Sequence, residues 1–376
     1  MHKTRPGGST DCNGVWRSNL VYPGRLEIPS GTVGTIEPAW KAIFSVLGKR
    51  NRCGNANPNW NARKSPILSR GGRKMRVLNF GSLNIDHVYQ VGHIVAPGET
   101  ISSASLKFVP GGKGLNQSIA LARAGVGTYH AGCIGNDGEI LKKQLLEAGV
   151  NTRFTRKLEE VNGHAIIQVN RDGQNSIIIY GGANIALTEK MVEDTLNEAE
   201  TPDLVLLQNE TSQVSYIAEA CGERGIPVAF NPSPYSEELK SFSFDKVRYL
   251  LINETEGKQI TGEVEPKKIA AYLLERYPNM RVVLTLGSKG VYYQDKQKCC
   301  LQDGFRVHAV DTTGAGDTFT GFFLGTILGG LSEEEALRWA CAAAALSVTK
   351  PGAAPSIPTM EEVRGFLESQ EIKTEN

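Results

Sequence analysis

A glycine-rich turn late in the chain carries the residues best suited to chemistry. The segment DTTGAGDTF, residues 311–319, lies between a strand-like run and a predicted helix. Gly314 and Gly316 allow a tight turn, so that N–H groups around Ala315 can point at one anion beside the positive end of the helix. Asp317, in the first helical turn, could take a proton from an attacking hydroxyl group. The turn predicts an anion hole with a general base, although an Asp here could also only stabilise the helix start.

A second glycine-rich turn, PGGKGLNQ at residues 110–117, also leads into a predicted helix. Glycines such as Gly112 and Gly114 admit the close approach of a polyhydroxylated ligand, and the side chains of Lys113 and Asn116 can hydrogen-bond its hydroxyl groups. A solvated loop with a lysine has the same composition, so this turn alone leaves both interpretations open.

Asn84 and Asp86, at the end of the first predicted strand, pose the same choice. The Asp carboxylate could bind two hydroxyl groups or cap a turn. Two common nucleotide-binding motifs are excluded. Phe319 stands where the third glycine of a Rossmann fingerprint belongs, and the chain contains no GxxxxGK[ST] loop.

Short apolar runs alternate with amphipathic stretches, which is typical of a mostly parallel sheet covered by helices. The predicted strands are residues 75–80, 203–208, 226–230, 247–252 and 281–286. The predicted helices are residues 115–124, 137–148, 213–224, 266–277, 315–328 and 333–349. Ser332, followed by three glutamates, predicts a capping box at the start of the last of these helices.

Further predicted strands interrupt this alternation. Residues 98–109 form one, and residues 164–170 and 175–180 form a hairpin through Asp172 and Gly173. Strands inserted between βα units usually build a separate small sheet. We expect a lid, with strands near residues 84–110 and 162–181, over the carboxyl edge of the main sheet, where open α/β folds bind ligands.

Charge is balanced over the chain but not along it. The 376 residues hold 41 Lys and Arg against 40 Asp and Glu, which indicates neither nucleic acid nor an anionic membrane as a partner. Residues 1–74, however, hold 13 Lys and Arg and 3 Asp and Glu, without sustained periodicity. We expect a poorly ordered basic extension over 1–74, a working domain over 75–368 and a tail over 369–376.

Cysteine usage and hydropathy indicate the compartment. The 7 cysteines are an odd number and form no CxxC pair, which favours reduced thiols and a cytoplasmic protein. No apolar run is long enough to span a bilayer.

Together, the GGKG turn at residues 111–114 and the DTTGAGD turn at residues 311–317 resemble the two signatures of the ribokinase-like, or PfkB, carbohydrate kinases. The likeness runs from about residue 76 to residue 358. It implies an α/β three-layer sandwich with a mostly parallel central sheet, helices on both faces and a small β-sheet lid. It also implies a homodimer formed through the lid.

The resemblance assigns roles position by position. The anion hole and base match Gly314, Ala315, Gly316 and Asp317. The sugar-binding positions match Asn84, Asp86, Gly112, Lys113, Gly114, Asn116, Glu210 and Asp317. The nucleotide positions match Asn253, Glu256, Thr285, Gly287, Ser288, Gly290, Gly316, Asp317 and Cys341. Of these, Glu256 would organise Mg²⁺ through water, and Cys341 departs from the His or Asn that relatives often place near adenine.

The family also holds a monovalent cation beside the anion hole. Its positions match Asp311, Thr313, Ser347, Lys350, Gly352 and Ser356, mostly through carbonyl oxygens. Hard oxygen ligands suit K⁺. The expected activity is ATP-dependent phosphorylation of D-ribose on its terminal hydroxyl. A deoxyribose, fructose or nucleoside kinase remains open, and so does a catalytically silent sugar sensor that has kept the fold.

Overall fold

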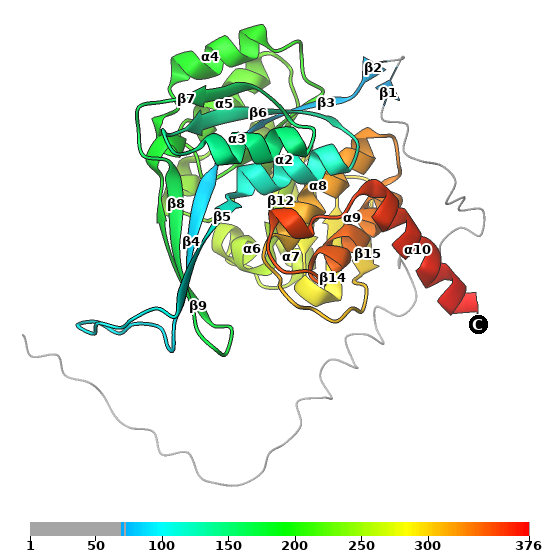
Figure 1. The fold of residues 1–376 in the computed structure, drawn as a ribbon. Helices are drawn as coiled ribbons and strands as arrows, with labels where there is room; N and C mark the ends of the chain where they lie inside the picture. The colour runs from blue at the N-terminus through cyan, green and yellow to red at the C-terminus, as the bar shows by residue number, and fades with distance from the viewer. Residues whose placement is uncertain (1–68, 71–72, 376) are drawn as a thin grey trace, which may run out of the picture. The chain divides into compact units, whose positions relative to one another are not determined.

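The structure is a computed structural model that describes residues 69–70 and 73–375 (Figure 1). The predicted basic extension over 1–74 therefore lies almost entirely outside the described residues. At its end, β1 (Ser69–Arg70) pairs antiparallel with β2 (Arg73–Lys74).

A nine-stranded sheet forms the centre of the described domain, in the order β15-β14-β13-β12-β11-β10-β3-β6-β7. Its strands are β3 (Arg76–Phe80), β6 (Gly127–Ile134), β7 (Asn151–Lys157), β10 (Leu204–Gln208), β11 (Val228–Asn231), β12 (Val247–Asn253), β13 (Arg281–Thr285), β14 (Gly290–Gln294) and β15 (Cys299–Asp303). The pairing is parallel except where β14 joins β13 and β15. Every residue of β10 is buried, as expected for a central strand covered on both faces.

Helices cover both faces of this sheet. The core cluster on one face takes side chains from α2 (Lys113–Arg123), α3 (Glu139–Glu147), α8 (Ala315–Leu328), α9 (Glu333–Ser347) and α10 (Met360–Glu375). The cluster on the other face takes side chains from α4 (Glu189–Glu198), α5 (Val214–Glu223), α6 (Glu254–Thr261) and α7 (Pro266–Arg276). Alternate residues of β10 enter alternate clusters, because successive side chains of a strand point to opposite faces. The predicted α/β sandwich is confirmed.

A four-stranded sheet forms the lid, in the order β5-β4-β8-β9. Its strands are β4 (Asn84–Gln90), β5 (Ser105–Gly111), β8 (Gly163–Val169) and β9 (Asn175–Tyr180), which extend beyond the helices in Figure 1. The hairpin at Gly173, where φ is 79°, is confirmed. The predicted strand over 98–109 starts too early: residues 98–104 are irregular apart from a turn at 98 and a bend at 104, and pairing begins at Ser105.

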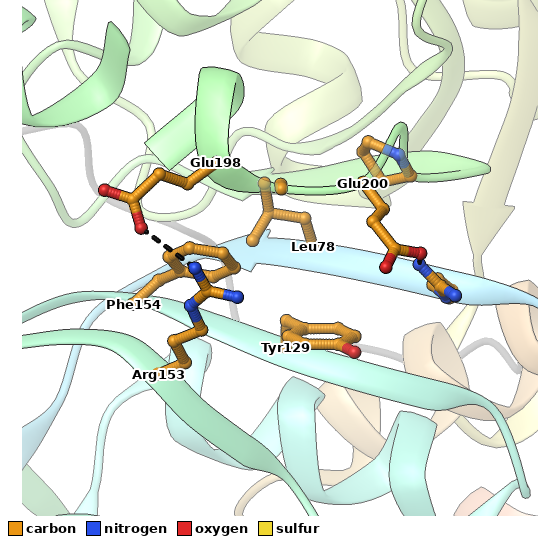
Figure 2. A pocket seen from close by; sticks show the side chains of 9 residues that line it. Leu78, Tyr129, Arg153, Phe154, Glu198 and Glu200 are labelled. Carbon is orange, nitrogen blue, oxygen red and sulfur yellow. Dashed lines mark hydrogen bonds and ion pairs between the residues drawn. The ribbon is translucent and has the colours of Figure 1, made fainter. Parts of the chain in front are cut away.

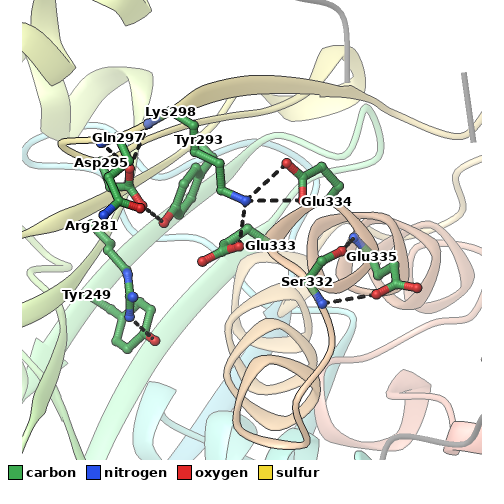
Figure 3. A network of polar contacts seen from close by, with 10 residues as sticks. All are labelled: Tyr249, Arg281, Tyr293, Asp295, Gln297, Lys298, Ser332, Glu333, Glu334 and Glu335. Atoms are coloured by element: carbon green, nitrogen blue, oxygen red, sulfur yellow. Dashed lines mark hydrogen bonds and ion pairs between the residues drawn. The ribbon is translucent and has the colours of Figure 1, made fainter. Parts of the chain in front are cut away.

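The capping box predicted at Ser332 is confirmed, and it belongs to a larger polar network (Figure 3). The Ser332 side chain accepts from Glu335 N at 3.2 Å, and Glu335 accepts from Ser332 N at 3.0 Å. Lys298, between β14 and β15, lies 2.7 Å from Glu333 and 3.2 Å from Glu334. The network joins the edge of the sheet to the N-terminus of α9, the helix that carries two of the predicted site residues.

Three helices depart from the sequence-based predictions. Helix α4 lies where no helix was predicted. Helix α10 continues to Glu375, through the tail predicted over 369–376. Helix α6 starts directly after β12, where the sequence analysis placed no helix. Within the described range, none of the helices combines the length and the apolar character that a bilayer-spanning segment needs.

Candidate active site

The carboxyl ends of the parallel strands and the N-termini of α2 and α8 bring the predicted residues together. The chain leaves β3 through Ser82, and Ser82 O accepts from Leu115 N at 3.0 Å, which holds the start of α2 against this turn. A Cβ on Gly114 would lie 2.3 Å from Ser82 N, so only glycine permits this approach. This edge is where open α/β sheets bind ligands.

Glu210, which follows β10, lies at the same place. One carboxylate oxygen accepts from Lys113 N at 3.0 Å and is also hydrogen-bonded by the Ser82 hydroxyl. Burial raises the pKa of Glu210, whereas the charge of Lys113 and the bond from Ser82 lower it. Glu210 therefore joins the turn after β3 to the glycine-rich turn before α2, next to the other predicted sugar-binding positions.

Asp86 projects from β4 toward the same corner. Burial, and secondarily the nearby Glu210, raise its pKa to about 6. A Cβ on Gly111 would lie 2.2 Å from Asp86 Oδ2, so the glycine on the paired strand makes room for the carboxylate. Two partly buried carboxyl groups in one corner are strong acceptors for sugar hydroxyl groups.

Two asparagines that the sequence analysis did not identify hold Asn84 and the preceding residue, Leu83. Asn184, in the 3₁₀ helix Gly182–Ala186, donates to Asn84 Oδ1 at 2.7 Å and accepts from Leu83 N at 2.9 Å. Asn162, just before β8, donates to Leu83 O at 2.9 Å. The peptide groups of Leu83, just before the lid, are thus fixed by side chains from the segments directly before β8 and after β9.

Asp317 lies in the first turn of α8, where Gly314 is the N-cap residue with φ at 74°. Its Oδ2 accepts from Asn116 Nδ2 at 3.0 Å and its Oδ1 from Gln117 Nε2 at 2.9 Å. A Cβ built on Gly316 would meet no atom within 4 Å, so the backbone there is open to an anion. First-turn N–H groups have no acceptor within their own helix, which makes this opening a fitting phosphate site.

Lys113 and Asn116 complete this region. Burial lowers the pKa of Lys113, but the charges of Asp317, Glu210 and Glu256 raise it further, so the pKa lies above its ordinary value. One cation thus stands among the carboxylates of the predicted base, sugar and Mg²⁺ positions. Asn116 Oδ1 is buried without a hydrogen-bond partner in the structure. A ligand hydroxyl would satisfy it.

The predicted nucleotide residues gather at the ends of β12 and β13. Asn253 Oδ1 accepts from Glu256 N at 2.9 Å, and Glu256 accepts from Asn253 N at 3.0 Å, which forms a capping box at the start of α6. Thr285 pairs with Asn253 across the strands. The turn that follows contains Gly287, with φ at 58°, Ser288 and Gly290, with φ at 111°.

Cys341 is buried on α9, and burial, with a smaller effect of Asp303, raises its pKa to about 12. Asp303 pairs with Gly290 at the end of the turn after β13. The structure therefore brings Cys341 near the turn that contains the predicted nucleotide residues. Its thiol stays protonated at neutral pH.

The predicted cation residues come together from two segments. Asp311 Oδ1 accepts from Thr313 N and Oγ1, and its Oδ2 accepts from Gly352 N at 2.8 Å. Burial raises the pKa of Asp311, but these bonds outweigh it, so the pKa lies below the ordinary value. Val310 N and Asp311 N both bond Val348 O, at 2.7 and 3.1 Å.

The other members of this set differ in what their side chains do. The buried Ser347 and Ser356 donate to carbonyl groups of their own turns, while the Lys350 ammonium pairs with Glu362 at 2.9 Å. Among the residues that the structure describes, no three His, Cys, Asp or Glu side chains cluster as a metal site. A cation here would use the carbonyl and hydroxyl oxygens of this loop, which are hard ligands.

A separate crevice of about 50 Å³ lies between β3, β6, β7 and the end of α4 (Figure 2). Ion pairs line it: Arg153 lies 3.2 Å from Glu198, and Arg76 is bonded to Glu200. Arg76 begins β3, so the crevice lies toward the opposite end of that strand from Asn84. None of the predicted site residues lines it.

Comparisons with known proteins identify the family. The profile of the pfkB family carbohydrate kinase matches residues 74–360. The ribokinase of Haemophilus influenzae is 39% identical over 300 residues, which cover 77% of this chain and 97% of the relative. The deoxyribokinase of Salmonella typhi is 30% identical over 306 residues, with 79% of this chain and all of the relative covered.

The structure of Arabidopsis thaliana ribokinase complexed with ribose and ATP superposes with a TM-score of 0.69 at 35% sequence identity, and the match covers 78% of this chain and 98% of that one. The resemblance drawn from the two glycine-rich turns is confirmed. The chain belongs to the pfkB family of carbohydrate kinases.

Proposed function

We propose that this chain is a ribokinase that transfers the γ-phosphoryl group of ATP to the terminal hydroxyl group of D-ribose. The observation that carries the proposal is the meeting of Asp86, Glu210 and Asp317 around the N-terminus of α2. The first two carboxyl groups suit a sugar with several hydroxyl groups, and the third lies beside an open anion site. Named ribokinases among the relatives support the same substrate.

In the proposed reaction, Asp317 accepts the proton of the terminal hydroxyl as its oxygen attacks the γ-phosphorus in line. The N–H groups of the turn Gly314–Asp317 hold the phosphoryl oxygens as their charge shifts toward the leaving ADP. Lys113 adds a positive charge among the surrounding carboxylates. Such chemistry depends on positioning and charge stabilisation more than on covalent catalysis.

The nucleotide and cation residues fit their proposed ligands. Asn253, Thr285 and the turn Gly287–Gly290 would hold ATP, with Cys341 packed near the base. Glu256 would hold Mg²⁺ through water. One of its carboxylate oxygens accepts from Asn253 N, and the other would face the water. When bound, Mg²⁺ neutralises phosphate charge, and K⁺ at the Asp311 loop would steady the neighbouring anion hole.

We also propose a cytoplasmic homodimer formed through the lid. The five described cysteines are free thiols, in keeping with a reducing compartment. Phe108 and Ile178 of the lid are each 62% exposed, which is unusual for large apolar side chains unless a partner covers them.

A substrate panel at fixed ATP, Mg²⁺ and K⁺ tests the proposed activity. We expect kcat/KM for ribose to exceed that for 2-deoxyribose, fructose and nucleosides by about tenfold or more. The reason is that a site built to bond a hydroxyl group rejects an analogue that lacks it. A faster rate with fructose or a nucleoside would contradict the ribose assignment and leave the kinase assignment standing.

Deoxyribose is the second candidate substrate, because a named deoxyribokinase is among the relatives. The same panel separates the two sugars through their ratio of kcat/KM. A catalytically silent sugar sensor would show no sugar-dependent ADP formation with any member of the panel.

A further inference from the structure

Four uncharged polar side chains lie buried behind the carboxylate of Asp317. Gln117 and Ser118 come from α2, Asn79 from β3 and Gln208 from β10, and each is at most 1% exposed. Burying such groups is costly unless they are hydrogen-bonded to one another. These four side chains form one hydrogen-bonded network.

The first part of this network contacts Asp317. Gln117 Nε2 donates to Asp317 Oδ1 at 2.9 Å and to Asn231 Oδ1 at 3.0 Å. Gln117 Oε1 accepts from Gln208 Nε2 at 2.8 Å. Gln208 Nε2 also donates to Asn79 Oδ1 at 2.9 Å. Gln117 thus uses both amide hydrogens and its oxygen.

The second part anchors the network to the backbone. Asn79 Nδ2 donates to Gly114 O at 2.9 Å and to Ser118 Oγ at 2.8 Å. Ser118 contacts His130 Nδ1 at 2.8 Å. Burial lowers the pKa of His130 to about 4, against a smaller opposing effect of the Gly81 backbone, so this ring is uncharged at neutral pH.

The direction of every amide follows from these anchors. A carbonyl oxygen can only accept, so Asn79 must turn its NH₂ toward Gly114 and its oxygen toward Gln208. Gln208 must then donate to Gln117 Oε1, which leaves the Gln117 NH₂ facing Asp317. Asn231 gives the same answer independently, because its Nδ2 donates to Leu251 O at 2.9 Å and its oxygen faces Gln117.

We propose that Gln117 is a positioning residue for Asp317, fixed as a hydrogen-bond donor by this network, an assignment that rests on the proposed role of Asp317 as base. With Gln117 on one carboxylate oxygen and Asn116 on the other, the carboxylate cannot rotate away from the attacking hydroxyl. A flipped Gln117 would set its own oxygen against the carboxylate. The network forbids that flip.

A double-mutant cycle between Gln117 and Asp317 tests the proposal. Gln117→Met keeps length and volume but removes the donor, and we expect kcat to fall by about 10- to 100-fold with KM for ATP unchanged. In an Asp317→Asn background, itself lower by about 10²- to 10⁴-fold, the same change should cost nothing more. Gln144→Met on α3 is the matched control and should leave kcat unchanged.

The outcomes separate this inference from the proposed function. A folded Gln117→Met protein with full turnover, or equal losses in both backgrounds, would overturn the positioning role alone. Full turnover of Asp317→Asn would overturn the base assignment and this inference with it. If Gln117→Met fails to fold, Gln208→Met takes its place in the cycle, because Gln208 touches neither substrate nor Asp317. Equal losses of kcat in both backgrounds would then overturn the positioning role.

Discussion

Asp86 and Glu210 hold two carboxyl groups in one buried corner before any sugar is bound. The folded protein must ionise Asp86 against burial and against the charge of Glu210, which together raise its pKa from 3.8 to about 6. An acid whose pKa is higher in the folded state destabilises that state once it is ionised. The cost is absent below the unfolded pKa, grows as the pH rises, and is complete above about 6.

Replacing Asp86 by Asn should therefore stabilise the ribose-free protein at about pH 7 and not at about pH 4. The expected gain in unfolding free energy is on the order of 1–3 kcal/mol at the higher pH, while affinity for ribose falls. Urea unfolding at the two pH values measures it. Asp172→Asn, at the exposed lid hairpin, is the control without a gain at either pH. An equal change at both pH values would contradict the burial argument.

The sequence identified the chemical residues better than the residues that support them. Asp317 and Lys113 stand in glycine-rich turns whose backbone requirements are visible locally. Gln117 carries no such signal, because its bond to Asp317 joins positions 200 residues apart. Asn184 and Leu83 lie 101 residues apart. Only the fold reveals such pairs.

At the scale of the elements, a small set of hydrogen bonds holds the segments where the chain enters and leaves the lid. Asn162 and Asn184 hydrogen-bond the peptide groups of Leu83. Asn184 also donates to Asn84, which is predicted to bind the sugar. The lid strands themselves pair only with one another. The orientation of β4 relative to the main sheet therefore depends strongly on these asparagines.

Asn184→Ala should weaken both the fold and the sugar site. It leaves the buried Leu83 N–H without its acceptor and frees the Asn84 side chain, so we expect about 1–3 kcal/mol less unfolding free energy. KM for ribose should rise while KM for ATP stays unchanged. Steady-state kinetics with each substrate varied in turn checks this split. Asn175→Ala, exposed on β9, should change neither KM. Parallel changes in both KM values for Asn184→Ala would contradict a specific role of Asn184 in holding the proposed sugar site.

Elements with long apolar runs or clear caps were predictable, and the others were not. The core strands β10 and β13 and the capped helix α9 agree with the sequence within a few residues. Strand β6, GTYHAGCI, was missed because its glycines and His130 do not read as a buried strand. The early start at residue 98 was wrong, because threonine and serine there resemble strand residues although they lie in an exposed segment without regular secondary structure.

At the scale of the whole molecule, the lid leaves an apolar row uncovered. Phe108, His87, Ile166 and Ile178 are paired across the four strands and lie on one face, opposite the face of Asp86. The Phe108 and His87 rings pack edge to face, with their centroids 4.8 Å apart. A second copy of the chain would bury this row.

Phe108→Glu should convert the proposed dimer into a monomer, because a carboxylate cannot be buried there without a partner. Sedimentation equilibrium over a range of protein concentrations measures the change. Val264→Glu replaces an equally exposed apolar residue outside the lid and should leave assembly unchanged. A wild-type protein that sediments as a monomer at every concentration would rule out the lid interface.

Strand β4 has two tasks, one on each face. Asp86 lies on the face of the proposed sugar site, and His87, the next residue, belongs to the row that we propose a second subunit covers. A sugar that fixes β4 through the face of Asp86 would also fix the row on the opposite face, which we propose a second subunit covers. By thermodynamic linkage, dimerisation must then change sugar affinity by the same factor by which sugar changes dimer affinity. If the proposed sugar site and the proposed dimer interface both use β4, the apparent affinity for sugar should depend on enzyme concentration.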